Sequence, residues 1–413
     1  MRKIYVFITM TIYGISGQPK YLENKVRYLV SEGLDVFVFS ALKLKSSKLM
    51  INLNNCCSQL IPALMYAPGC LCKSEVDNIL RSMIETINYK NDGEIYVESN
   101  SIASAEWGEM LAKKIQGKHI LFDLQEKFNL SEEEIDFLRF KLNRKELSGI
   151  AKTSVQDILK DKSIEFEDWM RIAAYCNNVV AECDDKFSAM LWRDANLTFG
   201  SIGRLEKSCV LPLLNGIIEY CSLNSGKYNI VMIGGGKKNN VKKIRNLIGK
   251  YPNINLIITD YIYPIPRSLL QNIDIFISTA GSAGVSFYEK RPTIIVHPIT
   301  GESVGIMGYT FISGKNSMFD SSTFNLVETI KQAIQEKDKI VYDNDYIESY
   351  NKRMKAEFQR QLGFFKNLNP REYYDTRNIH QKRSVKSILY YIMGKVLGSE
   401  KMQKILNTLR SLL

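Results

Sequence analysis

The stretch DIFISTAGSAGVSFYEKRPTIIVHP, residues 274–298, decides the fold. An apolar run, Ile275–Ile277, ends in TAGSAG, and a helix-compatible segment follows from about Ser282 to Lys290. A β-branched run, Thr293–Val296, then comes directly after Pro292. Strand, glycine-rich turn, helix and strand with these loop lengths predict a βαβ unit. The N–H groups at the start of such a helix suit an anion such as phosphate, although a turn that only packs helix on sheet has the same pattern.

The same alternation extends on both sides of this stretch. The chain begins with a predicted strand at Lys3–Thr9, a glycine turn, and a helix from about Tyr21 to Glu32. Further strands are predicted at Asp35–Phe39, Glu94–Val97, His119–Asp123, Asn178–Ala181, Tyr228–Ile233 and Asn255–Ile258, and helices at Glu75–Ile87 and Ala103–Ile115. Residues 43–73 predict an irregular excursion, and 131–192 favour long charged helices.

This pattern predicts an α/β fold with two Rossmann-like domains facing a cleft, followed by a helical, basic C-terminal tail. We expect an N-terminal domain over 1–193, a C-terminal domain over 194–345 and a helical region over 346–413. A chain of 413 residues is too long for one ordinary core, which agrees with two domains.

Composition excludes several classes of protein. The apolar N-terminus is interrupted by Thr9 and Thr11 and passes directly into a glycine turn, so we interpret it as a buried strand rather than a signal peptide. No apolar segment is long enough to span a bilayer. Eight cysteines without a C-x-x-C pair, and three histidines, argue against a Cys/His metal site. Asp343-Asn344-Asp345 is a D-x-D, which we interpret as a solvated turn, so we predict no metal and no cofactor.

The positive charge is concentrated in the tail. Residues 378–413 carry seven Lys or Arg and one acid, which is more than half of the formal charge of +11. Apolar positions recur there at helical spacing, and such a basic amphipathic helix is typical of attachment to an anionic membrane surface. A helix that closes over the body of the protein, or that meets a partner, has the same pattern. No nucleic-acid-binding module is recognisable.

Four segments in one order carry a resemblance to a known family. They are GISGQPKYLENKVRYLVSEGLDVFVFS (14–40), SIGRLEKS (201–208), NIVMIGGG (229–236) and IDIFISTAGSAGVSFYEKRPTIIV (273–296). Together they resemble the GT-B glycosyltransferases, especially the family 4-like group of bacterial polysaccharide pathways. The resemblance covers about residues 1–40 and 195–300 well, and 90–195 by layout alone.

The resemblance implies a nucleotide-sugar donor that binds mainly to the C-terminal domain. Arg204 matches the arginine that binds the donor diphosphate in the family, and Lys207 is the nearest candidate for its partner lysine, although it follows by three residues instead of about five. A fixed guanidinium beside a departing diphosphate is the electrostatic assistance that such a transfer needs without a metal. Two basic residues on a solvated loop are the alternative. The implied donor-binding residues of this domain are Gly234, Gly235, Ile262, Thr279, Gly281, Ser282, Ala283, Gly284 and Glu289.

One departure from the family concerns a carboxylate. The family has two glutamates eight apart, the second about seven residues before the proline, where this chain has Val285. The nearby acid is Glu289, three residues before Pro292, which either replaces the ribose-binding carboxylate or is a structural residue at the helix end. The hydroxyl groups of Ser278, Thr279 or Ser286 are the other candidates for this role.

The N-terminal domain would supply the acceptor side. Gly14, Gly17 and Gln18 match the family's glycine loop after the first strand. Asp123 ends the strand HILFD and Glu126 lies just after it, where a carboxylate could orient an acceptor hydroxyl or act as a base. An N-cap aspartate and a first-turn glutamate that stabilise the next helix would have the same pattern.

The resulting prediction is a cytoplasmic glycosyltransferase, peripheral to the inner face of the membrane through its tail. It would move a sugar, with retention if it follows family 4, from a nucleotide-diphosphate donor to a glycan or lipid-linked acceptor in capsule, lipopolysaccharide or exopolysaccharide assembly. Two alternatives stay open. One is a nucleotide-sugar epimerase, and the other is a membrane-binding protein on the same scaffold without transferase activity.

Overall fold

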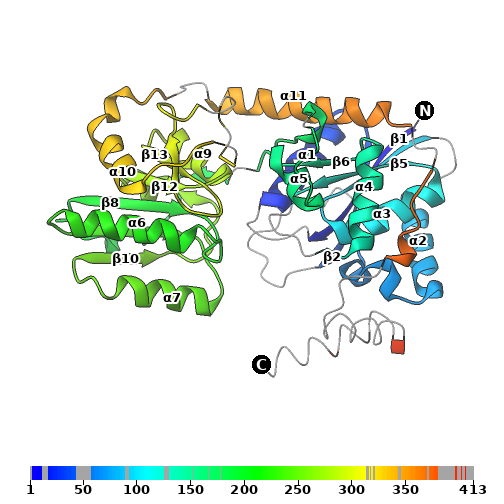
Figure 1. Ribbon diagram of the computed structural model, residues 1–413, viewed down its shortest axis with the longest axis horizontal. Coiled ribbons are helices and arrows are strands. Elements are labelled where there is room, and N and C mark those ends of the chain that lie inside the picture. The colour runs from blue at the N-terminus through cyan, green and yellow to red at the C-terminus, as the bar shows by residue number, and fades with distance from the viewer. Residues whose placement is uncertain are drawn as a thin grey trace. The chain divides into compact units, whose positions relative to one another are not determined.

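The chain forms two compact units, Met1–Cys176 with Lys352–Leu413, and Asn177–Asn351. The computed structural model describes residues 2–11, 17–42, 57–88, 93–124, 130–150, 152–165, 167–176, 178–312, 316, 318–319, 321–342, 346–369, 372–379, 396–397, 401 and 405. Figure 1 shows the elements of both units. No helix in these ranges is long and apolar enough to cross a membrane.

The first unit is built on a six-stranded parallel sheet with the order β3-β2-β1-β4-β5-β6. Its strands are β1 (Arg2–Thr11), β2 (Asp35–Leu42), β3 (Cys57–Leu60), β4 (Gly93–Ser99), β5 (Lys118–Asp123) and β6 (Leu147–Gly149). Its helices are α1 (Gly17–Ser31), α2 (Lys73–Ile87), α3 (Ile102–Ile115), α4 (Glu132–Asn143) and α5 (Lys152–Leu159), with most of α11 (Tyr346–Asn367). Side chains on both faces of β1 are fully buried, as expected for a central parallel strand covered by helices on both sides.

Helix α11 completes the core of the first unit. Phe358 and Phe365 are fully buried against the aromatic side chains of β1 and α1, with ring centroids 5.6 Å apart for Tyr5 and Phe365. Beside them Lys25 forms a buried ion pair with Glu98 at 2.5 Å and donates to Gln361 of α11 at 2.7 Å. A buried charge is tolerated only when it is paired in this way.

The second unit repeats the design. Its sheet has the order β10-β9-β8-β12-β13-β14, and all pairs are parallel except β13 with β14. Its strands are β8 (Leu197–Ile202), β9 (Tyr228–Ile233), β10 (Ile254–Ile258), β12 (Ile275–Ser278), β13 (Thr293–Val296) and β14 (Ser303–Ile306), and β7 (Val180–Ala181) pairs separately with β11 (Ile265–Pro266). Its helices are α6 (Val210–Leu223), α7 (Lys238–Ile248), α8 (Arg267–Gln271), α9 (Gly281–Tyr288) and α10 (Leu326–Gln335).

Short 3-10 turns join several elements. They are η2 (Pro62–Met65), η3 (Pro68–Cys70), η4 (Asp168–Met170), η5 (Ser188–Met190), η6 (Lys337–Lys339) and η7 (Thr376–Asn378). The predicted strand Tyr228–Ile233 matches β9 residue for residue, and the βαβ unit around residues 275–296 is confirmed.

Several local predictions differ from the structure. The excursion over 43–73 contains β3, which extends the sheet beside β2. The helical prediction for 131–192 is wrong after Leu159, because Lys160 takes a positive φ of 52° and residues 167–172 then run beside β6, where Ile172 donates to the carbonyl of Gly149. Pairing with a free sheet edge outweighs local helix propensity here.

The unit boundaries also differ from the predicted ends at 193 and 345. Residues 178–193 lie with the second unit, because β7 pairs with β11 and the side chain of Asn229 hydrogen-bonds both backbone groups of Trp192. Residues from Lys352 onward belong to the first unit.

Candidate functional site

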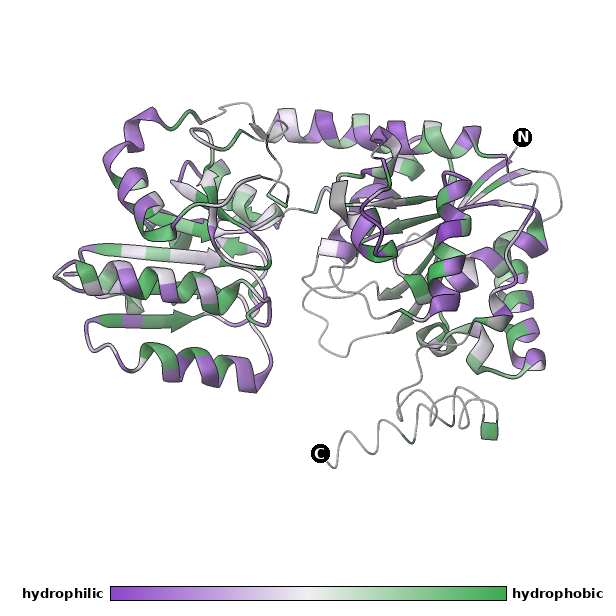
Figure 2. Cartoon of the chain, viewed as in Figure 1, coloured by the Kyte–Doolittle hydropathy of each residue, from purple (hydrophilic) through white to green (hydrophobic). Residues whose placement is uncertain are grey.

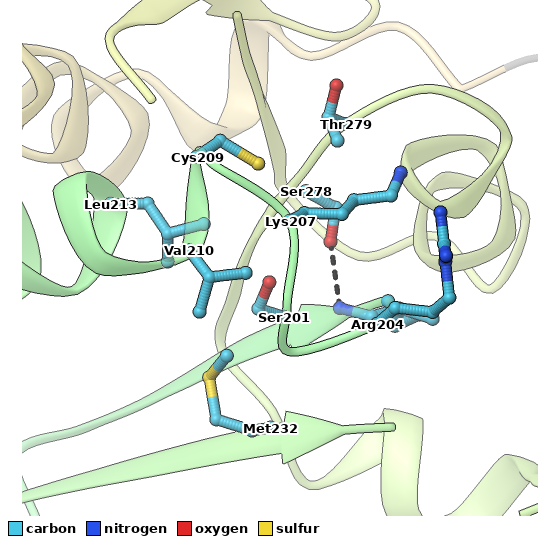
Figure 3. Close-up of a pocket in the computed structure, with 11 residues that line it drawn as sticks. Ser201, Arg204, Lys207, Cys209, Val210, Leu213, Met232, Ser278 and Thr279 are labelled. Atoms are coloured by element: carbon cyan, nitrogen blue, oxygen red, sulfur yellow. Dashed lines mark hydrogen bonds between the residues drawn. The ribbon is translucent and has the colours of Figure 1, made fainter. Parts of the chain in front are cut away.

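A basic loop follows β8 at the C-terminal edge of the second sheet. The loop begins at Gly203, carries Arg204 and Lys207, and leads into α6. The Arg204 guanidinium lies 3.6 Å from a carboxylate oxygen of Glu206, and its side chain is 43% exposed. Figure 3 shows the side chains of Arg204 and Lys207 extending to the same side of the loop, near Thr279.

Glycines allow this loop to lie against the end of β9. The N–H of Gly203 donates to the carbonyl of Ile233 at 3.0 Å, and that of Leu205 donates to the carbonyl of Gly235 at 3.0 Å. Gly234 has a φ of 149°, and a Cβ on it would lie less than 2.5 Å from the Gly203 carbonyl oxygen. A side chain at this position would therefore push the basic loop away from the sheet.

Residues Ser278 and Thr279 form the opposite wall, where β12 ends. The Ser278 hydroxyl accepts the Ile202 N–H at 3.1 Å, so that β12 is tied to the end of β8 (Figure 3). A pocket lies between these two strand ends and the start of α6. It is lined by Ser201, Ile202, Gly203, Arg204, Lys207, Cys209, Val210, Leu213, Met232, Ser278 and Thr279.

The turn from β12 into α9 is strained. Ala280 has φ 57° and ψ −144°, a region that is essentially restricted to glycine, at a cost of about 1–3 kcal/mol. The turn also has an unusual acceptor, because the Met318 sulfur accepts the Ala280 N–H at 3.2 Å and lies 3.6 Å from the Thr279 hydroxyl. A thioether is a weak acceptor, so a stronger one such as phosphate would compete with it for this N–H.

An exposed aromatic residue lies next to the glycine turn. Tyr261 is 45% exposed, and its ring lies against Gly235, where a Cβ would approach it to 2.7 Å. Partial burial raises the pKa of Tyr261, and the charge of Glu206 adds to this effect while Arg204 opposes it. Tyr261 therefore belongs to the same local group as the basic loop.

Other predicted donor-site residues lie away from this group. Ile262 packs against the apolar cluster around α8, and Ala283 and Gly284 are buried inside α9. Glu289 follows the last residue of α9 and forms an ion pair with Arg267 at 2.8 Å. An eight-residue helix is about 12 Å long, so Glu289 lies at the far end from the TAGSAG turn.

Where the family has its second glutamate, this chain has an apolar residue, Val285, and the next residue, Ser286, already has a hydrogen-bond partner. Val285 is 1% exposed within the core around α8. Ser286 is fully buried and lies 2.8 Å from the Thr293 hydroxyl. Of the three hydroxyl candidates, Ser278 and Thr279 line the pocket. The hydroxyl groups of Ser278 and Ser286 already form hydrogen bonds within the sheet, so Thr279 is the best placed of the three to bind a ligand.

In the first unit, three predicted residues lie at the C-terminal edge of the sheet. Gln18 donates to the Thr9 hydroxyl at 2.8 Å, and Gly17 lies against Cys176, whose sulfur would be 3.1 Å from a Cβ. Asp123 ends β5 and is 2% exposed. Gly14, Glu126 and the D-x-D at 343–345 lie outside the described residues.

The side chains that line the pocket include cationic and hydroxyl groups. Among the residues that the structure describes, no group of three or more His, Cys, Asp or Glu side chains could hold a metal ion. The arrangement of Arg204, Lys207 and Thr279 around one pocket can bind an anion through charge and hydrogen bonds.

Comparison with solved structures identifies the fold. The chain is similar to a glycosyltransferase from Rickettsia africae, with 15% sequence identity, 90% of this chain and 99% of that chain covered, and a TM-score of 0.58. HepE from Anabaena, solved with UDP and glucose, has 14% identity, coverage of 89% and 100%, and a TM-score of 0.51. The pneumococcal O-GlcNAc transferase GtfA, solved with UDP and GlcNAc, has 10% identity, coverage of 89% and 99%, and a TM-score of 0.50.

At these identities the likeness is one of fold. The two Rossmann-like α/β sheets have the GT-B fold, and the chain is structurally similar to GT-B glycosyltransferases. No protein-family model matches the chain, and neither does any curated protein.

Proposed function

We propose that this protein is a glycosyltransferase that takes a sugar from a nucleotide-diphosphate donor. The observation that carries the proposal is the pocket at the ends of β8 and β12, which Arg204, Lys207 and Thr279 line. The fold shared with HepE and GtfA, which were each solved with UDP and a sugar, supports a nucleotide-sugar as the ligand.

The diphosphate is the group that this pocket suits. When the bond from the sugar to the donor phosphate breaks, negative charge develops on the departing diphosphate. Arg204 and Lys207 would stabilise that charge, and the Ala280 N–H would add a hydrogen bond once the Met318 sulfur is displaced. Charge-assisted hydrogen bonds of this kind contribute about 1.5–3 kcal/mol each.

The ribose and the base would be held by other groups. Tyr261 offers an exposed ring beside the Gly235 turn, and Thr279 offers a hydroxyl. A carboxylate at the position of Val285 is absent, so we propose that the ribose is bound without it.

The first unit is proposed to hold the acceptor. Gly14, Gly17, Gln18, Asp123 and Glu126 remain the candidate residues for this role, and Asp123 or Glu126 would orient the acceptor hydroxyl. We propose that the acceptor is a glycan or lipid-linked and belongs to capsule, lipopolysaccharide or exopolysaccharide assembly, and that transfer proceeds with retention. The proposal also includes a cytoplasmic location and attachment to the membrane through 378–413.

Titration calorimetry with UDP, GDP and their common sugars tests the donor. We expect one nucleotide to bind, and Arg204→Met to weaken its binding about 10- to 100-fold through loss of one charge-assisted contact. The matched control is Arg193→Met, an exposed arginine of the same unit outside the pocket, which should leave binding unchanged. The proposal would be refuted if none of these nucleotides binds, or if both variants lose the same affinity.

A further inference from the structure

Two segments of the chain carry a large net positive charge. Residues 220–259 contain seven Lys or Arg and no acid, and 378–413 contribute a net +6. Because the whole chain carries +11, the remaining residues have a net charge of −2. The segment 220–259 includes α7, whose side chains the structure describes.

Helix α7 turns its basic residues to solvent. Ile244 and Ile248 are buried against the second sheet, so the apolar side of the helix is fully used in packing. Lys238, Lys242 and Arg245 follow one another at i, i+4 and i+7 and form a stripe about 10 Å long. All three are exposed, and Figure 2 colours much of α7 as hydrophilic.

Further lysines flank this stripe. Lys237, Lys243 and Lys250 are also exposed. Among the described residues, none of these six basic side chains forms a salt bridge, whereas Lys227 of the same segment pairs with Asp194 at 2.6 Å. We call these six residues the α7 basic surface, and they have no counter-charge in the part of the chain that the structure describes.

The arrangement is unfavourable for the helix itself. Like charges at i and i+4 destabilise a helix, and lysines at its first residues oppose the helix dipole. The helix start has no side-chain cap and no acidic residue in its first turn. A partner with negative charge would remove these repulsions.

We infer that the α7 basic surface binds the anionic headgroups of a lipid membrane. The stripe lies on the exposed side of a helix, which suits a flat array of phosphates. No aromatic residue occurs among residues 237–250, so the surface lacks the stacking groups typical of single-stranded nucleic-acid sites. With its apolar side packed on the sheet, α7 would bind through charge alone and would not insert into the bilayer.

This inference does not depend on the proposed transferase activity. Each basic residue near an anionic membrane surface contributes about fivefold in affinity, so three together contribute about 100-fold. The contact should weaken steeply with ionic strength, because it is electrostatic and exposed.

Co-sedimentation of the full chain with vesicles tests the surface. The vesicles are phosphatidylcholine alone, or phosphatidylcholine mixed with phosphatidylglycerol. The test variant is Lys238→Gln/Lys242→Gln/Arg245→Gln. The matched control, Lys227→Gln/Lys331→Gln/Lys339→Gln, removes the same charge from the same unit at three lysines that each pair with an acid.

We expect the unmodified chain and the control to bind the mixed vesicles, and the α7 variant to bind about 100-fold more weakly. Thermal unfolding of the α7 variant should be unchanged or slightly higher, since its substitutions are exposed and relieve repulsion. Equal binding by both triple variants would overturn the inference. So would an α7 variant that keeps vesicle binding but loses binding to a DNA duplex, because the surface would then be a nucleic-acid site.

Discussion

Substituting Gly234 by alanine should detach the basic loop from the sheet. Gly234 has a φ of 149°, and its added Cβ would lie under 2.5 Å from the carbonyl oxygen of Gly203. Gly203 offers a control in the same unit, because it has a φ of 153° and no atom within 4 Å of an added Cβ. Alanine at either position therefore has the same unfavourable φ, but only alanine at Gly234 also produces a steric clash.

The magnitudes follow from this difference. An L-residue at such a positive φ costs about 1–3 kcal/mol, which is our expectation for Gly203→Ala. Overpacking adds about 1–3 kcal/mol, and the hydrogen bond from the Gly234 N–H to the Thr259 hydroxyl, 3.2 Å long, is worth about 1 kcal/mol. Gly234→Ala should therefore destabilise the second unit by about 3–7 kcal/mol.

Hydrogen exchange of the β8 and β9 amides measures the opening free energy of this unit separately from the first. The Gly203→Ala variant should lose a fraction of what Gly234→Ala loses. Equal losses in the two variants would refute the reasoning, because they would show that the carbonyl of Gly203 moves aside without cost.

Three further predictions concern local features of the two units. Ala280→Gly should stabilise the second unit by about 1 kcal/mol in thermal unfolding, because release of the strain outweighs the added backbone entropy; a loss of stability would contradict the strained geometry. Met318→Leu should speed exchange of the Ala280 amide about three- to tenfold, since a similar volume is kept and only the acceptor is lost; an unchanged rate would rule out the contact. Burial, with the nearby charge of Lys141, lowers the pKa of His119 to about 4. The unfolded state therefore binds more protons than the folded state between about pH 4 and 6.5. Up to about 3 kcal/mol of stability should be lost as the pH falls through that range. Urea unfolding should show a weaker pH dependence in His119→Gln, and an identical dependence would contradict this origin.

Periodicity was sufficient for the strands because both sheets are buried on two sides. A central parallel strand such as Tyr228–Ile233 is a continuous apolar run, which the sequence displays directly. The antiparallel strand β14 lacks this signal, since SVGI is short and follows a loop. The extended residues Arg171 and Ile172 were also missed, because only the free edge of β6 makes their extended form favourable.

Only the basic residues and the glycines of the candidate site could be predicted from the sequence. Arg204, Lys207 and the Gly234 turn stand out in the sequence, and the structure brings them to one strand edge. The Met318 contact joins residues 38 positions apart, and no local pattern indicates it. The exposure of Tyr261 likewise depends on how the chain leaves β10, which involves a positive φ at Asp260.

During synthesis on the ribosome, the first unit begins earlier in the chain but can be completed only after the second unit. The second unit is one continuous segment, Asn177–Asn351, whereas the first waits for Phe358 and Phe365 to cover β1 and for Gln361 to bind the ammonium group of Lys25. The N-terminal sheet therefore leaves the ribosome with an uncovered apolar face and an incompletely satisfied buried charge. The second unit can fold while the first is still incomplete, and nascent chains that stop before Lys352 should depend on chaperones to stay soluble.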